Sequence, residues 1–189
     1  MGQQTRTRRE KFFLWLDAEM TGLDIDHDEL LEVAAIMTDV NLNIIAEGPE
    51  LVIYQPEFML QRMGEWCWDT HKKSGLVREV RKSQVTTADA ERELITFVKD
   101  VAPAGIVHLA GNSVYQDKAF IRRLMPRLDA LFHYRVIDVS TVKELGRAWY
   151  PDSPGKDFLK PDNHRALEDI RSSINELKHY RKYFFRDAL

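Results

Sequence analysis

Cysteine is almost absent from this chain of 189 residues: Cys67 is the only one, so no disulfide can form within it. A reducing compartment fits that count. No apolar run comes near the ~20 residues that a membrane-spanning helix needs. A large net charge is missing too, because the formal value is -3. The chain is therefore not expected to coat long nucleic acids through bulk positive charge.

The remaining composition is that of a globular protein, with 44% hydrophobic and 30% charged residues. Residues 11–189 are expected to form a single domain with one substantial core. Residues 1–10 carry three arginines and are expected to be a disordered terminus, a targeting remnant or a cloning residue. We leave the cytoplasm and the mitochondrion open as compartments.

Strands precede alternating helices and strands along the chain, a pattern typical of an α/β fold with a mixed sheet and helices on both faces. Residues 29–39 suit either a helix or a strand, and 41–55 read as a hairpin around Glu47-Gly48-Pro49. Residues 56–82 are expected to be helical in short pieces. Strands are expected near 12–16, 106–110 and 135–139, and helices over 87–101, 116–125, 140–149 and 164–184.

Two acids follow directly on the apolar strand 12–16. Asp17 and Glu19 are two residues apart, so in a strand both project from one face. Two carboxylates this close repel each other unless a divalent cation lies between them, and Mg²⁺ prefers such oxygen ligands. Solvated acids at the end of a strand are the alternative, and the pair alone does not decide between them.

Two further places carry acids that could join this pair. Asp117 follows the strand 106–110 near the start of a helix, at the strand end where α/β sheets bind ligands. His164 and Asp169 lie five residues apart at the start of the last helix. Helix-terminal acids and a capping histidine are the simpler explanations of these residues.

Taken together, the ordered set resembles the DEDDh 3′→5′ exonucleases. Within them, the oligoribonuclease family is the most similar, because long stretches between residues 12 and 185 match it. The stretches that carry the resemblance are 13–24, 41–49, 111–113, 133–135, 138–145 and 164–166. One departure is Ala18, where the family is expected to have leucine; it points away from the acids.

The resemblance implies an RNase H-like fold and two-metal-ion hydrolysis of RNA from its 3′ end. Asp17, Glu19, Asp117 and Asp169 would hold two Mg²⁺ or Mn²⁺ ions ~4 Å apart. His164 would act as the general base, which suits a side chain that titrates near neutral pH. The substrates would be RNAs of two to about five nucleotides, and the products 5′-nucleoside monophosphates.

The same resemblance implies how the substrate is held. Leu23 and Trp66 would sandwich a base, and His71 would lie near a phosphate or ribose. The 5′ phosphate would be capped by Ser113, Arg135, Ser140 and Lys143. The family is homodimeric, and Tyr134 and Arg135 would reach the neighbouring subunit's site. Ordinary core packing is the alternative for Leu23 and Trp66, and a solvated surface is the alternative for the cap residues.

Three other functions compete with this interpretation. A DEDDh exonuclease for longer RNA or DNA would need an open basic groove rather than a phosphate cap. A non-catalytic RNA-binding protein with an exonuclease fold would have no need of all five site residues. An RNase H-like endonuclease would give no role to His164 or to the residues that bind RNA ends.

Overall fold

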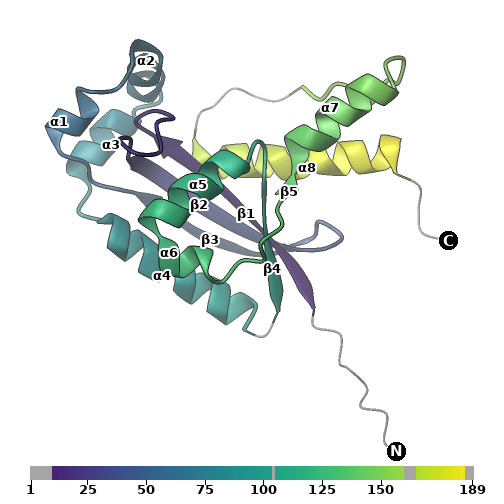
Figure 1. The fold of residues 1–189 in the computed structure, drawn as a ribbon, viewed down its shortest axis with the longest axis horizontal. Coiled ribbons are helices and arrows are strands. Elements are labelled where there is room, and N and C mark those ends of the chain that lie inside the picture. The colour runs from purple at the N-terminus through teal and green to yellow at the C-terminus, as the bar shows by residue number, and fades with distance from the viewer. Residues whose placement is uncertain (1–9, 104, 160–164, 186–189) are drawn as a thin grey trace, which may run out of the picture.

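A central mixed sheet organises the protein, which a computed structural model describes over residues 10–103, 105–159 and 165–185. Its strand order is β3-β2-β1-β4-β5 (Figure 1). The strands are β1 (Lys11–Met20), β2 (Leu30–Asp39), β3 (Ile44–Val52), β4 (Ile106–Gly111) and β5 (Ile137–Asp138). β2 runs antiparallel to β1 and β3, whereas β1, β4 and β5 are parallel. The expected α/β fold with a mixed sheet is confirmed.

Helices cover both faces of this sheet (Figure 1). One face carries α4 (Thr87–Val101), α5 (Tyr115–Leu124) and α6 (Pro126–Asp129), and the other carries α7 (Val139–Trp149) and α8 (Ala166–Phe184). Three shorter helices, α1 (Glu57–Leu60), α2 (Glu65–Lys73) and α3 (Leu76–Lys82), pack around Leu31 in a separate small core. Each sheet face therefore has its own apolar core.

The amphipathic patterns of the sequence explain these layers. α4 begins with a capping box in which Thr86 and Asp89 exchange side-chain and backbone hydrogen bonds. In α8 the stripe predicted from the sequence is buried against β1 and β2. β2 is buried at almost every position because helices lie on both of its faces, and this burial decides the strand over the helix for 29–39.

The hairpin expected around Glu47-Gly48-Pro49 is wrong. The chain continues through these residues as the single strand β3, and Gly48 and Pro49 lie together opposite Ala35 in a β-bulge. Proline is tolerated there because β3 is an edge strand, where one lost backbone donor leaves the ladder of the other strands intact. An added Cβ at Gly48 would meet the Phe97 ring at 2.8 Å, so glycine permits the close packing of α4 on this bulge.

The true reversal lies between β2 and β3, at residues 40–43. Asp39 accepts hydrogen bonds from the backbone of Asn41 and Asn43, at 2.8 and 2.9 Å. Leu42 takes a left-handed conformation with φ 69°. The turn signal is therefore carried by the aspartate and asparagine side chains rather than by a Gly-Pro pair.

The other expected helices and strands are present within a few residues of their predicted ends. The expectation for the N-terminal segment falls mostly on residues 1–9, and His164 also lies outside the described residues. Within the described residues, we find no helix with the length and apolarity required to cross a bilayer.

Candidate active site

Alternation along β1 determines where its two acids point. Leu16 and Ala18 belong to the core under α4 and α5, whereas Trp15 belongs to the core under α8. Asp17 and Glu19 follow Trp15 at intervals of two residues, and such residues of a strand point to the same face. Their side chains therefore project on the face of the sheet that α8 covers. The strand thus delivers two carboxylates to one side of the sheet.

α8 brings a third carboxylate to the same place. Asp169 lies in the first turn of this helix, where the helix dipole favours negative charge. One ligand oxygen from each of Asp17, Glu19 and Asp169 lies within 4.8 Å of the others. These three predicted metal ligands converge in space, although Asp17 and Asp169 lie 152 positions apart along the chain.

Asp117 approaches this cluster from α5. Its side chain is buried, and its Oδ1 accepts a hydrogen bond from the backbone N–H of Ala18 at 3.0 Å. Ala18 is the residue between the two strand acids, so Asp117 is fixed directly beside them. All the predicted metal-ligating acids are therefore described, and they gather around the end of β1.

The electrostatics of the cluster are dominated by burial and by repulsion between neighbouring acids. Burial, with the nearby charges of Asp17 and Asp169, raises the pKa of Glu19 to about 8. Burial and the charge of Asp17 also raise the pKa of Asp117 well above its usual value. The cluster by itself thus favours protonated carboxyls, and a bound cation would favour the ionised ones.

A divalent cation fits this donor set. Carboxylate oxygens are the ligands that Mg²⁺ and Mn²⁺ prefer, and three of them, one from each of Asp17, Glu19 and Asp169, converge here. A cation would also offset the burial and the like-charge repulsion that raise the two pKa values. The acidic cluster therefore has the chemistry of a divalent metal site.

A buried ion pair, which the sequence reasoning missed, fixes the start of α8. Glu32 on β2 is fully buried and pairs in register with Glu19. Its carboxylate accepts hydrogen bonds from the Arg165 guanidinium, at 2.7 Å to the nearer oxygen, and from the Ala166 N–H at 3.1 Å. Arg165 precedes α8 directly, so this pair anchors the helix that carries Asp169. A lone acid inside the apolar run of β2 was the available signal.

The residues expected at a terminal base lie in two different environments. Leu23 and Trp66 each have 67% of their surface exposed, which excludes core packing for both. Trp68 instead packs against the small core of α1, α2 and α3. His71 is buried, with Nε2 3.0 Å from the Met20 carbonyl and Nδ1 3.8 Å from Glu19. His71 thus lies next to Glu19, one of the predicted metal ligands.

Three of the four predicted phosphate-cap residues are brought together. Ser113 follows β4, and Ser140 lies in the first turn of α7. Their hydroxyl oxygens are 3.1 Å apart, and the Ser113 N–H donates to the Ser140 Oγ at 3.0 Å. Lys143 lies one turn further along α7, where its Nζ is 3.2 Å from the buried Glu176. Sequence reasoning gave no role to Glu176, which is masked by the apolar stripe of α8.

The fourth cap residue, Arg135, is exposed and lies outside this group of contacts. Its guanidinium lies over the Tyr134 ring, 5.0 Å from the centroid. Tyr134 is 72% exposed, and its ring centroid lies 4.5 Å from that of His133 at a tilt of 31°. The His133 ring in turn lies 4.4 Å from that of His108 at a tilt of 36°. A row of ring contacts thus leads from His108 on β4 to the exposed Tyr134 and Arg135.

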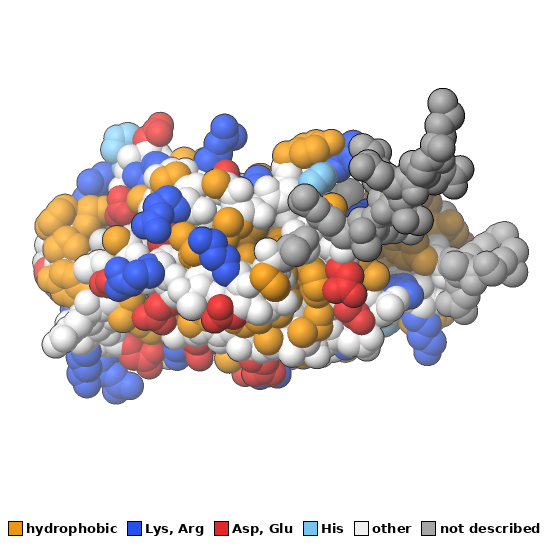
Figure 2. Space-filling view, turned by 90° about the horizontal axis from the view of Figure 1, so that it is seen from below, with side chains coloured by type: hydrophobic (Ala, Val, Ile, Leu, Met, Phe, Trp, Pro, Cys, Tyr) orange, Lys and Arg blue, Asp and Glu red, His pale blue; other side chains and the backbone are white. Residues whose placement is uncertain are grey.

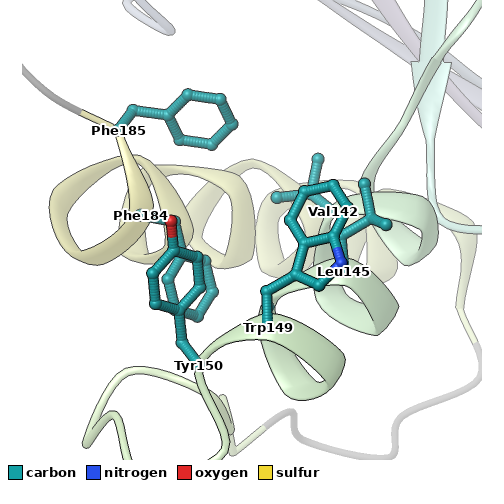
Figure 3. A pocket seen from close by; sticks show the side chains of 7 residues that line it. Val142, Leu145, Trp149, Tyr150, Phe184 and Phe185 are labelled. Atoms are coloured by element: carbon teal, nitrogen blue, oxygen red, sulfur yellow. The ribbon is translucent and has the colours of Figure 1, made fainter.

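An apolar pocket of about 170 Å³ lies at the other end of α8 from Asp169. Figure 3 shows Trp149 and Leu145 on α7 facing Phe184 and Phe185 across it. Trp149 and Phe185 are more than half exposed.

On the face seen in Figure 2, basic and acidic side chains of the described residues are interspersed. That face does not present a continuous basic groove.

Comparisons with known proteins agree with this geometry. Residues 14–177 match the model of the exonuclease family RNase_T. The chain is 49% identical over 176 residues to the mitochondrial oligoribonuclease of Homo sapiens, covering 93% of this chain and 74% of that protein. It is 51% identical over 173 residues to the oligoribonuclease of Vibrio cholerae, covering 92% and 95% of the two chains.

Solved structures give the fold independently. Exonuclease I of E. coli in complex with a DNA oligonucleotide superposes with a TM-score of 0.69 at 17% identity. The match covers 93% of this chain and 41% of that one, so the chain spans about two fifths of the length of exonuclease I. A product-bound exonuclease I gives a TM-score of 0.70 at 16% identity, over 93% of this chain and 44% of that one. The expected RNase H-like fold is confirmed.

Proposed function

This chain belongs to the exonuclease family, and within it to the oligoribonucleases, and we propose that its acidic cluster hydrolyses very short RNAs from the 3′ end. It is a 3′→5′ exoribonuclease, a phosphodiester hydrolase whose products are 5′-nucleoside monophosphates. The observation that carries the assignment of the site is the convergence of Asp17, Glu19 and Asp169 within 4.8 Å. The non-catalytic alternative is not favoured, because the acids that catalysis needs are present and adjacent.

The cofactors in this proposal are two divalent cations, Mg²⁺ or Mn²⁺. Asp17, Glu19, Asp117 and Asp169 would hold them. When bound, such ions supply Lewis acidity, which activates a water and stabilises charge on the leaving oxygen. The protein's own contribution is to hold these acids close together, with the backbone N–H of Ala18 fixing Asp117 in place.

His164 is the proposed general base. An imidazole that titrates near neutral pH can accept the proton of the attacking water at one ring nitrogen. The anchoring of the next residue, Arg165, by Glu32 supports this role, because it ties the adjoining chain to the strand beside Glu19.

Substrate length is set, in this proposal, by contacts at both ends of a short RNA. Leu23 and Trp66 stack on a base, which their exposure supports. Ser113, Ser140, Lys143 and Arg135 bind the 5′ phosphate, and His71 binds near a phosphate or ribose of the substrate. The adjacent hydroxyls of Ser113 and Ser140 support a built anion site at one end.

The protein is proposed to act as a homodimer in which Tyr134 and Arg135 complete the neighbour's site. The high exposure of Tyr134 supports this, as does the exposed apolar patch of Trp149, Tyr150 and Phe185. Residues 11–189 form one exonuclease domain in this account. Relatives of the chain include mitochondrial proteins, so both the mitochondrion and the cytoplasm are proposed compartments.

Cleavage of 5′-labelled RNAs of two to twenty nucleotides tests the function. The expected result is rapid cleavage of RNAs of two to five nucleotides with Mg²⁺ or Mn²⁺, and none with EDTA. Equal rates at all lengths would favour the exonuclease for longer nucleic acids. Cleavage that survives EDTA would contradict the metal-dependent mechanism.

A further inference from the structure

A buried acid of α8 lies outside the acidic cluster of Asp17, Glu19 and Asp169. Glu176 is 1% exposed and follows Asp169 by seven residues, so both point from the same helix face, two turns apart. Its Oε1 accepts from the Tyr180 hydroxyl at 2.9 Å and lies 3.2 Å from the Lys143 Nζ. Its Oε2 accepts from the Asn112 Nδ2 at 2.9 Å. A buried carboxylate with three donors is a fixed point of the structure.

One arm of contacts leads from Glu176 to the two serines. Asn112 gives its amide hydrogens to Glu176 and to Ser173, so its Oδ1 is left to accept from the Ser140 hydroxyl at 3.1 Å. The Ser140 oxygen in turn contacts the Ser113 hydroxyl. The carboxylate thereby sets which way the Asn112 amide faces, and the amide sets the orientation of the serine hydroxyls.

The other arm leads to Lys143. A lysine side chain has four flexible carbons, and its ammonium takes no fixed direction without a partner. Glu176 provides that partner from the buried side, while 28% of the Lys143 side chain stays exposed. The remaining ammonium hydrogens are left for an anion that arrives from solvent.

We propose that Glu176 is the positioning residue of the 5′-phosphate site. It holds Lys143 by charge and the Ser113–Ser140 hydroxyls through Asn112, without touching the substrate. This inference rests on the proposed function, since it concerns the end of the RNA opposite the metal site. One residue would then orient three cap residues, Ser113 after β4 and Ser140 and Lys143 on α7.

The test compares two substrates, a dinucleotide with a 5′ phosphate and the same dinucleotide with a 5′ hydroxyl. The wild-type protein should cleave the phosphorylated one with the higher kcat/KM. In Glu176→Gln, the ratio of the two kcat/KM values should fall about tenfold, because charge-assisted contacts weaken. The change should come mainly from KM for the phosphorylated dinucleotide, with the 5′-hydroxyl substrate nearly unaffected.

Matched variants separate positioning from stability. Tyr180→Phe removes another hydrogen bond of Glu176 but leaves Lys143 and Asn112 in place, so it should lower Tm and keep the substrate ratio. Glu144→Gln changes an exposed glutamate of α7 that pairs with Arg147, and it should alter neither quantity. If Glu176→Gln does not fold, Asn112→Ala cuts the same network from its other side and should lower the ratio.

The outcomes distinguish this inference from the function on which it rests. A wild-type protein that cleaves neither dinucleotide contradicts the proposed function. A wild-type protein that cleaves both equally has no 5′-phosphate preference, which overturns the positioning role. A clear wild-type preference that is kept in folded Glu176→Gln, or in Asn112→Ala if the first variant is unfolded, also overturns it.

Discussion

The metal cluster and the proposed phosphate site differ in how their charges are satisfied. Around Asp17 and Glu19, acids gather beside further acids, and the pKa of Glu19 is raised to about 8. Around Ser113 and Ser140, every link of the network meets a donor or acceptor at 2.9–3.2 Å, including the buried Glu176. The first region has the chemistry of a divalent metal site, whereas the second is held together by hydrogen bonds and an ion pair within the protein.

This difference teaches which region should limit stability and which should limit specificity. Ionising buried acids whose pKa values are raised costs folding free energy, which a bound cation would restore. A network whose polar groups all have partners costs little folding free energy, and it determines where an anion can bind. The predictions below attack one region at a time.

The largest effect is expected for Asp17→Asn. Loss of one metal-ligating carboxylate should lower RNA cleavage by about 10³ to 10⁵-fold, the size of several kcal/mol of lost charge stabilisation. The metal-free Tm should rise slightly, because one member of a repelling group becomes neutral. Cleavage assays and thermal unfolding in EDTA check both. Retained activity with a large drop in Tm would make Asp17 a structural residue.

His164→Ala should slow cleavage by about 10² to 10⁴-fold, the usual effect of losing a general base. Substrate binding should stay near normal. The wild-type rate should rise with pH through a group near neutrality, and that rise should be missing in the variant. An unchanged pH profile at full rate would leave His164 as a helix cap.

Glu19→Gln should stabilise the metal-free protein at alkaline pH. The pKa of Glu19 is raised from 4.5 to about 8 in the folded protein, so ionising it costs stability. The stability that protonated Glu19 contributes is fully present below pH 4.5 and is lost as the pH rises through 8. Wild type should therefore lose ~2–4 kcal/mol more than the variant between pH 5 and 9. Urea unfolding in EDTA measures this, and parallel pH slopes for the two proteins would refute it.

Arg135→Ala tests the phosphate region from its exposed side. A dinucleotide has few anchors, so its kcat/KM should fall about 10 to 10²-fold when one charge-assisted contact is lost. Longer RNAs extend past this point and should lose less. Removal of the substrate's 5′ phosphate should mimic the substitution, and both changes together should add little. Equal losses at all lengths would argue against a cap.

A mixture of Arg135→Ala with Asp17→Asn tests whether the site is shared between subunits. In a mixed dimer, one site has intact carboxylates and receives an intact arginine from its neighbour. Partial recovery of activity is expected. No recovery, with heterodimers shown to form, would place Arg135 in its own subunit's site or outside any site.

The sequence predicted the metal region better than the network behind the phosphate region. Asp17 and Glu19 follow the two-residue period of a strand, so their common direction is a local property that a sequence shows. Asp169 could be placed near them only through the family resemblance, because no local rule brings residue 169 to the end of β1. Glu176 and Glu32 were missed because a single acid in an apolar segment gives no sign of which distant donor will satisfy it.

The error at residues 47–49 has a similar cause. Gly-Pro is a turn signal in isolation, yet the edge position of β3 and the packing of Phe97 turn it into a bulge. Edge position is a property of the whole sheet, which a segment read alone does not contain. Local rules therefore worked where neighbours in sequence are neighbours in space, and failed where tertiary partners decide.

The contrast between the two regions is tested most directly by thermal unfolding at pH 8 against Mn²⁺ concentration. Wild type, Asp17→Asn and Ser140→Ala are compared after removal of metal with EDTA and dialysis. The account predicts that Mn²⁺ raises the Tm of wild type and Ser140→Ala by similar amounts and that of Asp17→Asn by far less. An equal rise in all three proteins, or no rise in wild type, would contradict a cation site at the end of β1.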